Sequence, residues 1–379
     1  MKPKIVFTGG GTGGHIFPII AIKRALVKQK PDYRFFYLGP IDSYQELLQK
    51  EGFIVIPILS GKLRRYLTIE GVFKTFLDLF KLPIGFLKAF WVLLKIKPNL
   101  IFSKGGYGAI PIIFAGSILK IPIFVHEADS IASLSTRISQ KFAKKIFISF
   151  PKTSGLNVPE DKIICSGNPI RKELLTGSKE VGEKIFQITK EKPVILILGG
   201  SQGSQRINNV IIKSLKNLLE TFEIIHQVGA RNFKDIASYY KFFLPKELQK
   251  YYHFYGFLNE EQLKHAFKVA HLVISRAGSG AIFEIAANGK ASVLIPLQES
   301  AQNHQRSNAY QYAQYGAAIV VEEQNFKPNF LIELLKELFS KFSKIKQMEH
   351  SAQLFAKPKA ADIIAHHIIN FLSNGTIKS

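Results

Sequence analysis

Short apolar runs alternate with longer amphipathic stretches along the whole chain, and this alternation constrains the fold more than any other feature. Each apolar run has the length of a strand buried on both faces, and the stretches between them have the pattern of helices. Such alternation predicts parallel sheets covered by helices on both faces. The runs expected to form strands are Ile5–Thr8, Phe35–Leu38, Ile54–Ile56, Leu100–Phe102, Ile123–Val125, Lys145–Ile148, Val194–Leu198, Glu223–Gln227, His253–Tyr255, Leu272–Ile274, Ser292–Ile295 and Ala318–Val321.

The pattern restarts after Pro169, which predicts an α/β protein of two doubly wound units in tandem. A chain of 379 residues suits two domains, since domains usually have roughly 100–200 residues. Gly167-Asn168-Pro169 interrupts the pattern and marks the boundary. The expected division is an N-terminal domain of residues 1–166, a second domain of residues 167–358, and a C-terminal helix in residues 359–379 that packs back on the N-terminal domain.

Composition indicates a folded chain rather than a disordered one, with 46% hydrophobic and 21% charged residues. The single cysteine, Cys165, excludes a disulfide framework within the chain and suits a reducing compartment. The first apolar run is too short for a signal-peptide core and ends in glycines. We therefore interpret it as a buried first strand and expect the protein in the cytoplasm.

The formal net charge is +23. Such a charge favours partners that carry phosphate or anionic lipid, although solvated lysines without any partner would give the same total. The sequence has no Arg-rich tail, zinc-finger spacing or aromatic RNA-binding motif, so we do not expect nucleic acid as a partner.

Four glycine-rich turns each follow an expected strand: Gly9–His15, Gly105–Gly108, Gly199–Gly203 and Ala277–Gly280. Ligands of open parallel sheets bind beyond the carboxyl ends of the strands. Glycines let the backbone approach a ligand closely, and a helix that follows offers free N–H groups to an anion. Two such turns in each half predict ligands rich in phosphate.

The first turn contains the spacing Gly9-x-Gly11-x-x-Gly14, which alone would suggest a dinucleotide. That interpretation needs an acid at the end of the second strand, and Phe35–Gly39 contains none. The Gly-Lys-Ser/Thr of a P-loop is absent as well. A dinucleotide oxidoreductase is therefore disfavoured.

On these motifs the chain resembles the bacterial MurG family. The stretches that carry the resemblance are TGGGTGGHIFP, KGGYGA, HEAD, GNPIR, GGSQGS, SRAGSGAIFE and Gln305-x-x-Asn308-Ala309, and they span nearly the whole length. The resemblance implies a GT-B fold, in which two Rossmann-like domains face each other across a cleft. It implies inverting transfer of N-acetylglucosamine from UDP-N-acetylglucosamine to the muramoyl C4 hydroxyl of undecaprenyl-pyrophosphoryl-MurNAc-pentapeptide, which converts lipid I to lipid II in peptidoglycan synthesis. The implied location is peripheral, on the cytoplasmic face of the bacterial inner membrane.

Two features of the second half suit a nucleoside diphosphate on physical grounds. Glu284 lies in the first turns of a helix expected to begin near Ser279, where a carboxylate can accept two hydrogen bonds from a ribose diol, and the resemblance implies this role. The alternative is an acid that only balances the helix dipole. Ser201 and the N–H groups of Gln202 and Gly203 lie where another helix begins, which suits the donor's diphosphate.

The resemblance implies further donor contacts, residue by residue. Arg171 matches a donor-contacting position at the domain junction, where the alternative role is a salt-bridged hinge residue. Gln305 matches a position that faces the donor sugar, and Leu258 matches a backbone contact to the uracil region. The other implied contacts to UDP-N-acetylglucosamine are Thr12, Gly13, Gly14, Asp129, Ser279, Gly280, Ala281, Ile282 and Phe283.

An inverting transfer needs a base that takes the proton from the acceptor hydroxyl. His15 is the leading candidate, because it lies at the end of the first strand among glycines; the alternative is a histidine that only caps the turn. Glu127 is the second candidate, and the sequence does not choose between them. Asp129 stands where the family often has Asn and so lacks the amide donor. The residues expected at the acceptor's diphosphate are Gly105, Gly106 and Tyr107.

The chain has no D-x-D motif, so we expect neither a metal nor another cofactor. Helix N-termini and Arg171 would then stabilise the departing UDP. Two alternatives remain: another GT-B enzyme with a different UDP-sugar or a glycolipid acceptor, and a binding module without catalytic activity.

Residues 72–97 contain no apolar run long enough to span a membrane, yet their polar residues form one stripe at helical spacing. Cations precede the segment at Lys62, Arg64 and Arg65. This pattern predicts a helix that rests on an anionic membrane surface, with a buried crossover helix as the alternative. The stripe is Lys74, Asp78, Lys81, Lys88 and Lys95, and the apolar face includes Phe73, Phe76, Phe80, Phe86, Phe90 and Trp91.

Overall fold

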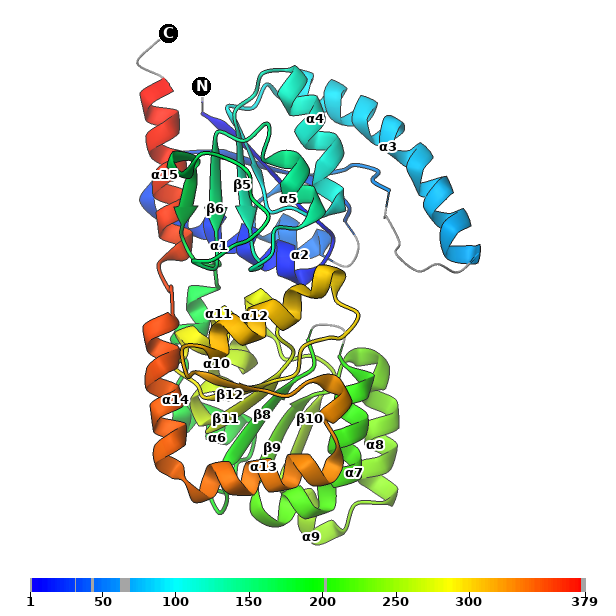
Figure 1. Ribbon diagram of the computed structural model, residues 1–379, viewed down its shortest axis with the longest axis vertical. Coiled ribbons are helices and arrows are strands. Elements are labelled where there is room, and N and C mark those ends of the chain that lie inside the picture. Colours follow the sequence, from blue (N-terminus) through cyan, green and yellow to red (C-terminus); the bar gives the residue numbers. More distant parts are fainter. Residues whose placement is uncertain (1, 31, 42–43, 62–68, 201–202, 376–379) are drawn as a thin grey trace. The chain divides into compact units, whose positions relative to one another are not determined.

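The chain divides into two compact units in the computed structural model (Figure 1). The structure describes residues 2–30, 32–41, 44–61, 69–200 and 203–375, with the backbone alone for 69–81, 301 and 375. The N-terminal unit comprises Met1–Arg171 and Pro358–Ser379, and the C-terminal unit comprises Lys172–Lys357.

The segment from Gly167 to Arg171, which the sequence placed in the second domain, belongs to the N-terminal unit. The Gly167 N–H donates to the Ile148 carbonyl at 3.2 Å, and a ring nitrogen of His126 lies 3.2 Å from the Gly167 carbonyl. These contacts hold the GNPIR stretch against the first sheet, and local sequence gave no sign of them.

The N-terminal unit has a parallel sheet in the order β3-β2-β1-β4-β5-β6-β7. Six of its strands lie where the apolar runs predicted them. The edge strand β7 was not predicted, because its apolar run has only three residues, whereas the equally short β13, Ala318–Val320, lies within the longer apolar run 317–321. The strands are β1 Lys4–Thr8, β2 Arg34–Gly39, β3 Ile54–Pro57, β4 Leu100–Ser103, β5 Ile123–Glu127, β6 Lys145–Ile148 and β7 Ile163–Cys165.

Helices cover both faces of this sheet. The last helix of the chain, α15, lies beside α1 and buries Ile364, Ala365 and Ile368 in the same core as Ile5 and Phe7 of β1 (Figure 1). The end of the chain therefore completes the core of its first unit. The helices are α1 Gly13–Gln29, α2 Gln45–Lys50, α3 Ile69–Ile96, α4 Ile110–Ile118, α5 Leu134–Ser139 and α15 Ala360–Gly375.

Helix α3 touches the sheet through a narrow stripe at Gly85, Ala89 and Leu93, which are buried at a spacing of four residues. A Cβ at Gly85 would lie 1.9 Å from the Leu59 carbonyl oxygen, so glycine is required for this close approach. Among the helices that the described residues form, none is both long and apolar enough to cross a bilayer.

The C-terminal unit has a second parallel sheet, in the order β10-β9-β8-β11-β12-β13. All six strands were predicted, with ends that differ by a residue. They are β8 Val194–Leu198, β9 Glu223–Gln227, β10 Tyr252–Tyr255, β11 Leu272–Ser275, β12 Ser292–Leu294 and β13 Ala318–Val320. Its helices are α6 Lys179–Ile185, α7 Gln205–Thr221, α8 Phe233–Phe242, α9 Lys246–Gln249, α10 Glu260–Val269, α11 Ser279–Ala287, α12 His304–Ala313, α13 Pro328–Ser340 and α14 Phe342–Phe355.

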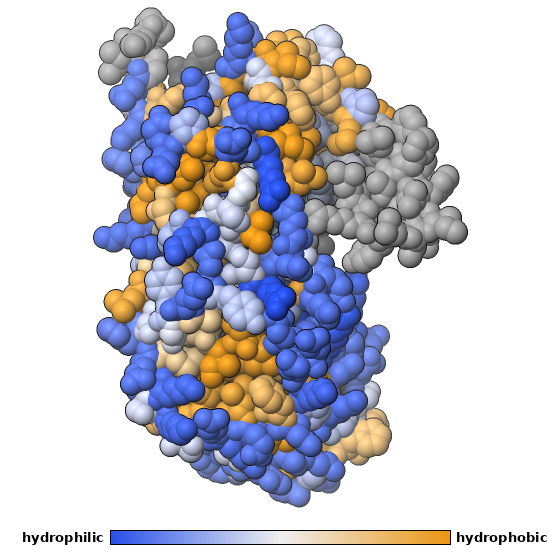
Figure 2. All heavy atoms as spheres, in the orientation of Figure 1, coloured by the Kyte–Doolittle hydropathy of each residue, from blue (hydrophilic) through white to orange (hydrophobic). Residues whose placement is uncertain are grey.

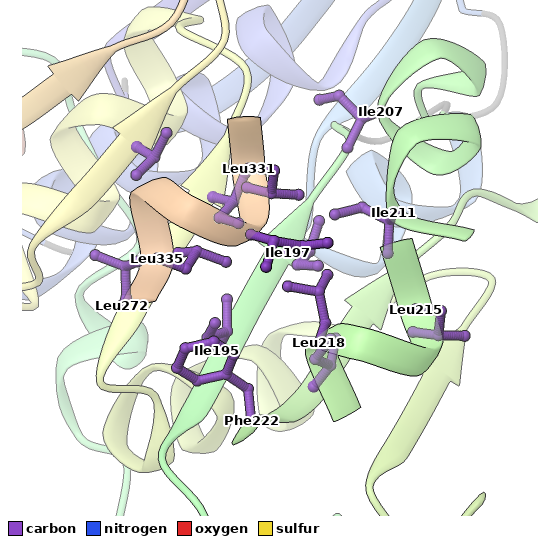
Figure 3. Close-up of a cluster of buried hydrophobic side chains, with 14 of the residues drawn as sticks. Ile195, Ile197, Ile207, Ile211, Leu215, Leu218, Phe222, Leu272, Leu331 and Leu335 are labelled. Carbon is purple, nitrogen blue, oxygen red and sulfur yellow. The ribbon is translucent and has the colours of Figure 1, made fainter. Parts of the chain in front are cut away.

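The core of this unit lies between β8 and the helices α7 and α13 (Figure 3). Ile207, Ile211, Leu215 and Leu218 of α7 follow helical spacing and are buried in the same core as Ile197 of β8 (Figure 3). Burial of each such side chain contributes about 1.5–3 kcal/mol. This packing fixes the start of α7, which directly follows the third glycine turn.

Candidate functional site

The first glycine turn leads from β1 into α1 and places His15 in the first turn of the helix. Thr12 is the N-cap in extended conformation, and its carbonyl accepts the His15 N–H at 2.9 Å. The Thr12 hydroxyl and His15 Nδ1 are 2.9 Å apart. This contact fixes the ring orientation and leaves Nε2 as the nitrogen that faces away from the helix cap. Gly13 and Gly14 open the helix.

Two glycines flank the His15 ring. A Cβ at Gly10 would lie 2.9 Å from His15 Nδ1, and a Cβ at Gly106 would lie 3.0 Å from Nε2. Gly106 has φ +82°, so both space and backbone conformation require glycine there. The first and second glycine turns therefore meet at this imidazole.

Lys104 directly follows β4 and, like His15, lies close to Gly9. A Cβ at Gly9 would be 3.3 Å from His15 Cβ and 3.5 Å from Lys104 Cβ, so the two side chains are neighbours. Lys104 is 3% exposed, and its Nζ is buried without a hydrogen-bond partner among the described residues. Lys104 is the first residue of the KGGYGA stretch, and the sequence alone indicates no role for it.

These groups shift one another's protonation. Burial, and then the Lys104 charge, lower the pKa of His15 to about 4, against an opposing effect of Asp129. Burial lowers the pKa of Lys104 to about 8, against the attraction of Glu127 and Asp129. At neutral pH the imidazole is uncharged and able to accept a proton.

Glu127, the second candidate base, ends β5 and is 3% exposed. One carboxylate oxygen accepts the Asp129 N–H at 3.0 Å, and the other accepts the N–H and hydroxyl of Ser133 at 2.9 and 3.0 Å. Both oxygens therefore hold the HEAD loop in place. This engagement leaves neither oxygen of Glu127 without a hydrogen bond, which favours a positioning role for Glu127 over that of a base.

The second glycine turn is expected at the acceptor's diphosphate. The Gly105 N–H donates to the Ser103 hydroxyl at 3.1 Å, and the Gly106 N–H donates to the Ser135 hydroxyl at 2.9 Å. A phosphate at these N–H groups would have to displace the two serines. Tyr107, half-buried, begins a short 3₁₀ helix at the same place.

Arg171 is 5% exposed and lies over the Phe17 ring of α1, with its guanidinium carbon 4.2 Å from the ring centroid. Such stacking holds the side chain in one position. The predicted donor contact of Arg171 thus starts from a packed residue rather than from a mobile surface side chain.

The third glycine turn lies in the C-terminal unit, between β8 and α7. Ser201, the predicted diphosphate ligand, and Gln202 lie outside the described residues. Next to them, Ser204 caps α7, and its hydroxyl accepts a hydrogen bond from Arg276 at 2.7 Å. Arg276 also pairs with Glu323, which lies just after β13. Arg276 therefore links the third glycine turn to the segment that follows the edge strand β13.

The fourth glycine turn opens α11 at Ser279, with Gly278 as its N-cap. Ile282 and Phe283 are fully buried in the core, so only their backbone could contact a ligand, whereas Gly280 and Ala281 are half-buried. Glu284 is half-buried one turn into the helix. Its position suits either the ribose contact or the dipole-balancing role.

The predicted backbone contact at Leu258 has its N–H already occupied by Gln227 Oε1 at 3.0 Å. Gln227 Nε2 in turn donates to the Gly200 carbonyl at 2.9 Å, which links two loops at the carboxyl end of the sheet. Gln305 Oε1 accepts the Leu297 N–H at 3.0 Å and so holds the loop after β12. Sequence reasoning missed Gln227, although its position as the last residue of β9 was a usable signal.

Two family models match the chain: the glycosyltransferase family 28 N-terminal domain over residues 5–148 and the family 28 C-terminal domain over residues 194–364. A relative from Treponema denticola is 34% identical, with 98% of each chain covered, and one from Clostridium tetani is 36% identical, with 93% of this chain and 94% of the relative covered. Both are named UDP-N-acetylglucosamine–N-acetylmuramyl-(pentapeptide) pyrophosphoryl-undecaprenol N-acetylglucosamine transferase. The chain belongs to this transferase family.

The MurG resemblance drawn from the motifs is therefore confirmed. The fold agrees as well, since the crystal structure of MurG from Acinetobacter baumannii matches 97% of this chain and 99% of its own with a TM-score of 0.73 at 24% identity. A UDP-GlcNAc 2-epimerase from Neisseria meningitidis bound to UDP-GlcNAc matches 97% of this chain with a TM-score of 0.66 at 14% identity. The two parallel-sheet units are thus those of a GT-B fold in the MurG family.

Proposed function

We propose that this chain moves N-acetylglucosamine from UDP-N-acetylglucosamine to the muramoyl C4 hydroxyl of lipid I, and so makes lipid II for peptidoglycan. Membership of the MurG family supports the reaction and both substrates. The observation that carries the mechanism is the position of the His15 imidazole, which is held between two glycine turns at the carboxyl end of β1.

In this mechanism His15 acts as the base. When Nδ1–H donates to the Thr12 hydroxyl, Nε2 carries the free lone pair and takes the proton of the acceptor hydroxyl. The hydroxyl oxygen attacks the anomeric carbon as the bond from that carbon to the diphosphate oxygen breaks, which inverts the configuration and releases UDP. The N-termini of α7 and α11 offer N–H groups to the departing diphosphate.

The direct test measures release of UDP from UDP-N-acetylglucosamine in the presence and absence of lipid I, with the lipid product identified by mass. We expect release only with lipid I and a product that carries one more N-acetylhexosamine. Transfer to diacylglycerol instead would favour the glycolipid synthase, and donor binding without turnover would favour a binding module.

Glu284 is assigned to the ribose hydroxyls of the donor. The substitution Glu284→Gln removes charge-assisted hydrogen bonds worth about 1.5–3 kcal/mol, so we expect UDP to bind about 10- to 150-fold more weakly, as measured by calorimetry. Glu260→Gln, which changes an acid in the first turn of α10, is the matched control. Unchanged UDP affinity in Glu284→Gln would leave Glu284 only the dipole-balancing role.

The exposed side of α3 is proposed to rest on the anionic surface of the inner membrane, which makes the enzyme peripheral. Ile84, Leu87 and Trp91 are 56%, 56% and 59% exposed at helical spacing, and Ile118 of α4, the helix packed against α3, is 60% exposed. Figure 2 shows hydrophobic side chains gathered over α4 and the adjoining end of α3. Exposed Lys88 and Lys95 on α3 supply positive charge beside them.

The triple variant Ile84→Ser, Leu87→Ser, Trp91→Ser should bind anionic phospholipid vesicles at least about tenfold more weakly in sedimentation, because insertion of each apolar side chain contributes on the order of 1 kcal/mol. The control variant Phe242→Ser, Phe243→Ser alters two aromatic residues at the end of α8 that are more exposed than Ile84, Leu87 and Trp91. It should keep full binding. Equal binding by both variants would contradict the proposed membrane contact. The predicted cations Lys62, Arg64 and Arg65 lie outside the described residues, and the side chains of Phe73, Phe76 and Phe80 are not described.

A further inference from the structure

The proposed mechanism gives no role to the buried charge of Lys104. Lys104 is 3% exposed, and its Nζ has no hydrogen-bond partner among the described residues. It directly follows β4, at the carboxyl end of the sheet, where His15 also lies. A buried cation without a hydrogen-bond partner is costly and is rarely kept without compensation. A role for the charge itself would account for its presence.

The backbone fixes the position of this lysine beside the imidazole. The Lys104 N–H donates to the Thr8 carbonyl at 2.8 Å, which continues the pairing of β1 with β4. Both Lys104 and His15 flank Gly9 closely enough that any side chain there would touch their Cβ atoms. The sheet and the first glycine turn therefore fix where the Cβ atoms of the two side chains lie relative to each other.

The polar and titratable groups of this cluster come from three elements. Thr12 and His15 belong to the start of α1, Lys104 follows β4, and Asp129 follows β5. Burial is the main cause of the lowered pKa of His15, the Lys104 charge lowers it further, and Asp129 opposes both effects. Glu127 and Asp129 both attract the Lys104 ammonium, which also acts on His126 of β5.

We propose that Lys104 is a positioning residue for His15, whose buried ammonium acts together with burial of the ring to keep the imidazole in the uncharged form that accepts the proton of the acceptor hydroxyl. The carboxylates of Glu127 and Asp129 compensate part of the cost of burying this ammonium. Glu127 therefore has two tasks, because it also fixes the HEAD loop that carries Asp129. The proposal rests on the proposed function, since it assigns His15 as the base.

The first arm of the test follows the His15 imidazole by NMR during a pH titration, with its resonance identified by its absence in His15→Asn. In Lys104→Met we expect the His15 titration to move up by about one pH unit, because a neighbouring like charge has been removed. Lys104→Arg keeps the charge and should titrate close to the unchanged protein. Lys4→Met is the control, because Lys4 lies at the amino end of β1 and donates to the Ile96 carbonyl.

The second arm measures the pH dependence of kcat/KM, whose acidic limb reports the base in the free enzyme. In Lys104→Met this limb should move to higher pH by the same amount as the NMR titration, and in Lys104→Arg it should stay. An unchanged His15 titration in folded Lys104→Met would overturn the proposal, and so would a shifted titration without a shifted limb. Full activity of His15→Asn would instead remove His15 from the proposed mechanism, a result that the NMR arm cannot produce.

Discussion

The variant His15→Asn is expected to lower kcat for lipid II formation by about 10²- to 10⁴-fold, the range that a positioned general base contributes. Asparagine is similar in size to the ring and can still reach the Thr12 hydroxyl, so the first glycine turn should keep its conformation. The loss should therefore fall on kcat, with little change in the affinity for UDP. Single-turnover measurements with lipid I and titration with UDP separate the two quantities.

His366→Asn is the control for this experiment, because His366 is an exposed histidine of α15 that contacts Asn370. It should retain normal kcat. If His15→Asn also retained most of its kcat, His15 would only cap the turn, and the base would lie elsewhere. Glu127 would then be the next residue to test, despite the hydrogen bonds that occupy both of its oxygens.

The second large effect concerns stability. Lys104→Met is expected to raise the free energy of unfolding by about 1–3 kcal/mol at pH 7, because burial lowers the pKa of Lys104 from 10.5 to about 8. Between these values the unfolded chain holds the proton more strongly than the folded protein does. The stability of the unchanged protein therefore rises with pH from about 8 to 10.5, and the cost of the buried ammonium is present in full below that window.

Urea unfolding at several pH values measures this prediction. The advantage of Lys104→Met should be largest at pH 7 and should shrink as the pH approaches 10, since the lysine of the unchanged protein then loses its proton. A variant less stable than the unchanged protein at every pH would mean that the aliphatic stem of Lys104 packs better than methionine does. The pH dependence distinguishes charge from packing, which a single measurement at pH 7 does not.

Much of the fold could be predicted because its signals are local. A run such as Val194–Leu198 is apolar at every position, and only a strand covered on both faces can bury all of its side chains. The glycine turns were visible for the same reason, since a positive φ such as the +82° of Gly106 favours glycine whatever lies around it. The edge strand β7 was missed, because its apolar run of three residues, Ile163–Cys165, is too short to indicate a strand.

The sequence by itself determined that two parallel sheets form, that glycine turns follow their strands and that His15 stands in one of them. Only the tertiary structure decided which polar groups are left for chemistry. Both His15 and Glu127 are candidate bases in the sequence. In the structure, residues of its own loop engage both oxygens of Glu127, whereas the Thr12 hydroxyl engages only Nδ1 of His15. Nothing in the local sequence distinguishes Lys104 from a surface lysine, yet it is 3% exposed in the structure. Burial and hydrogen bonding depend on contacts between residues far apart in the chain, so local sequence cannot reveal them.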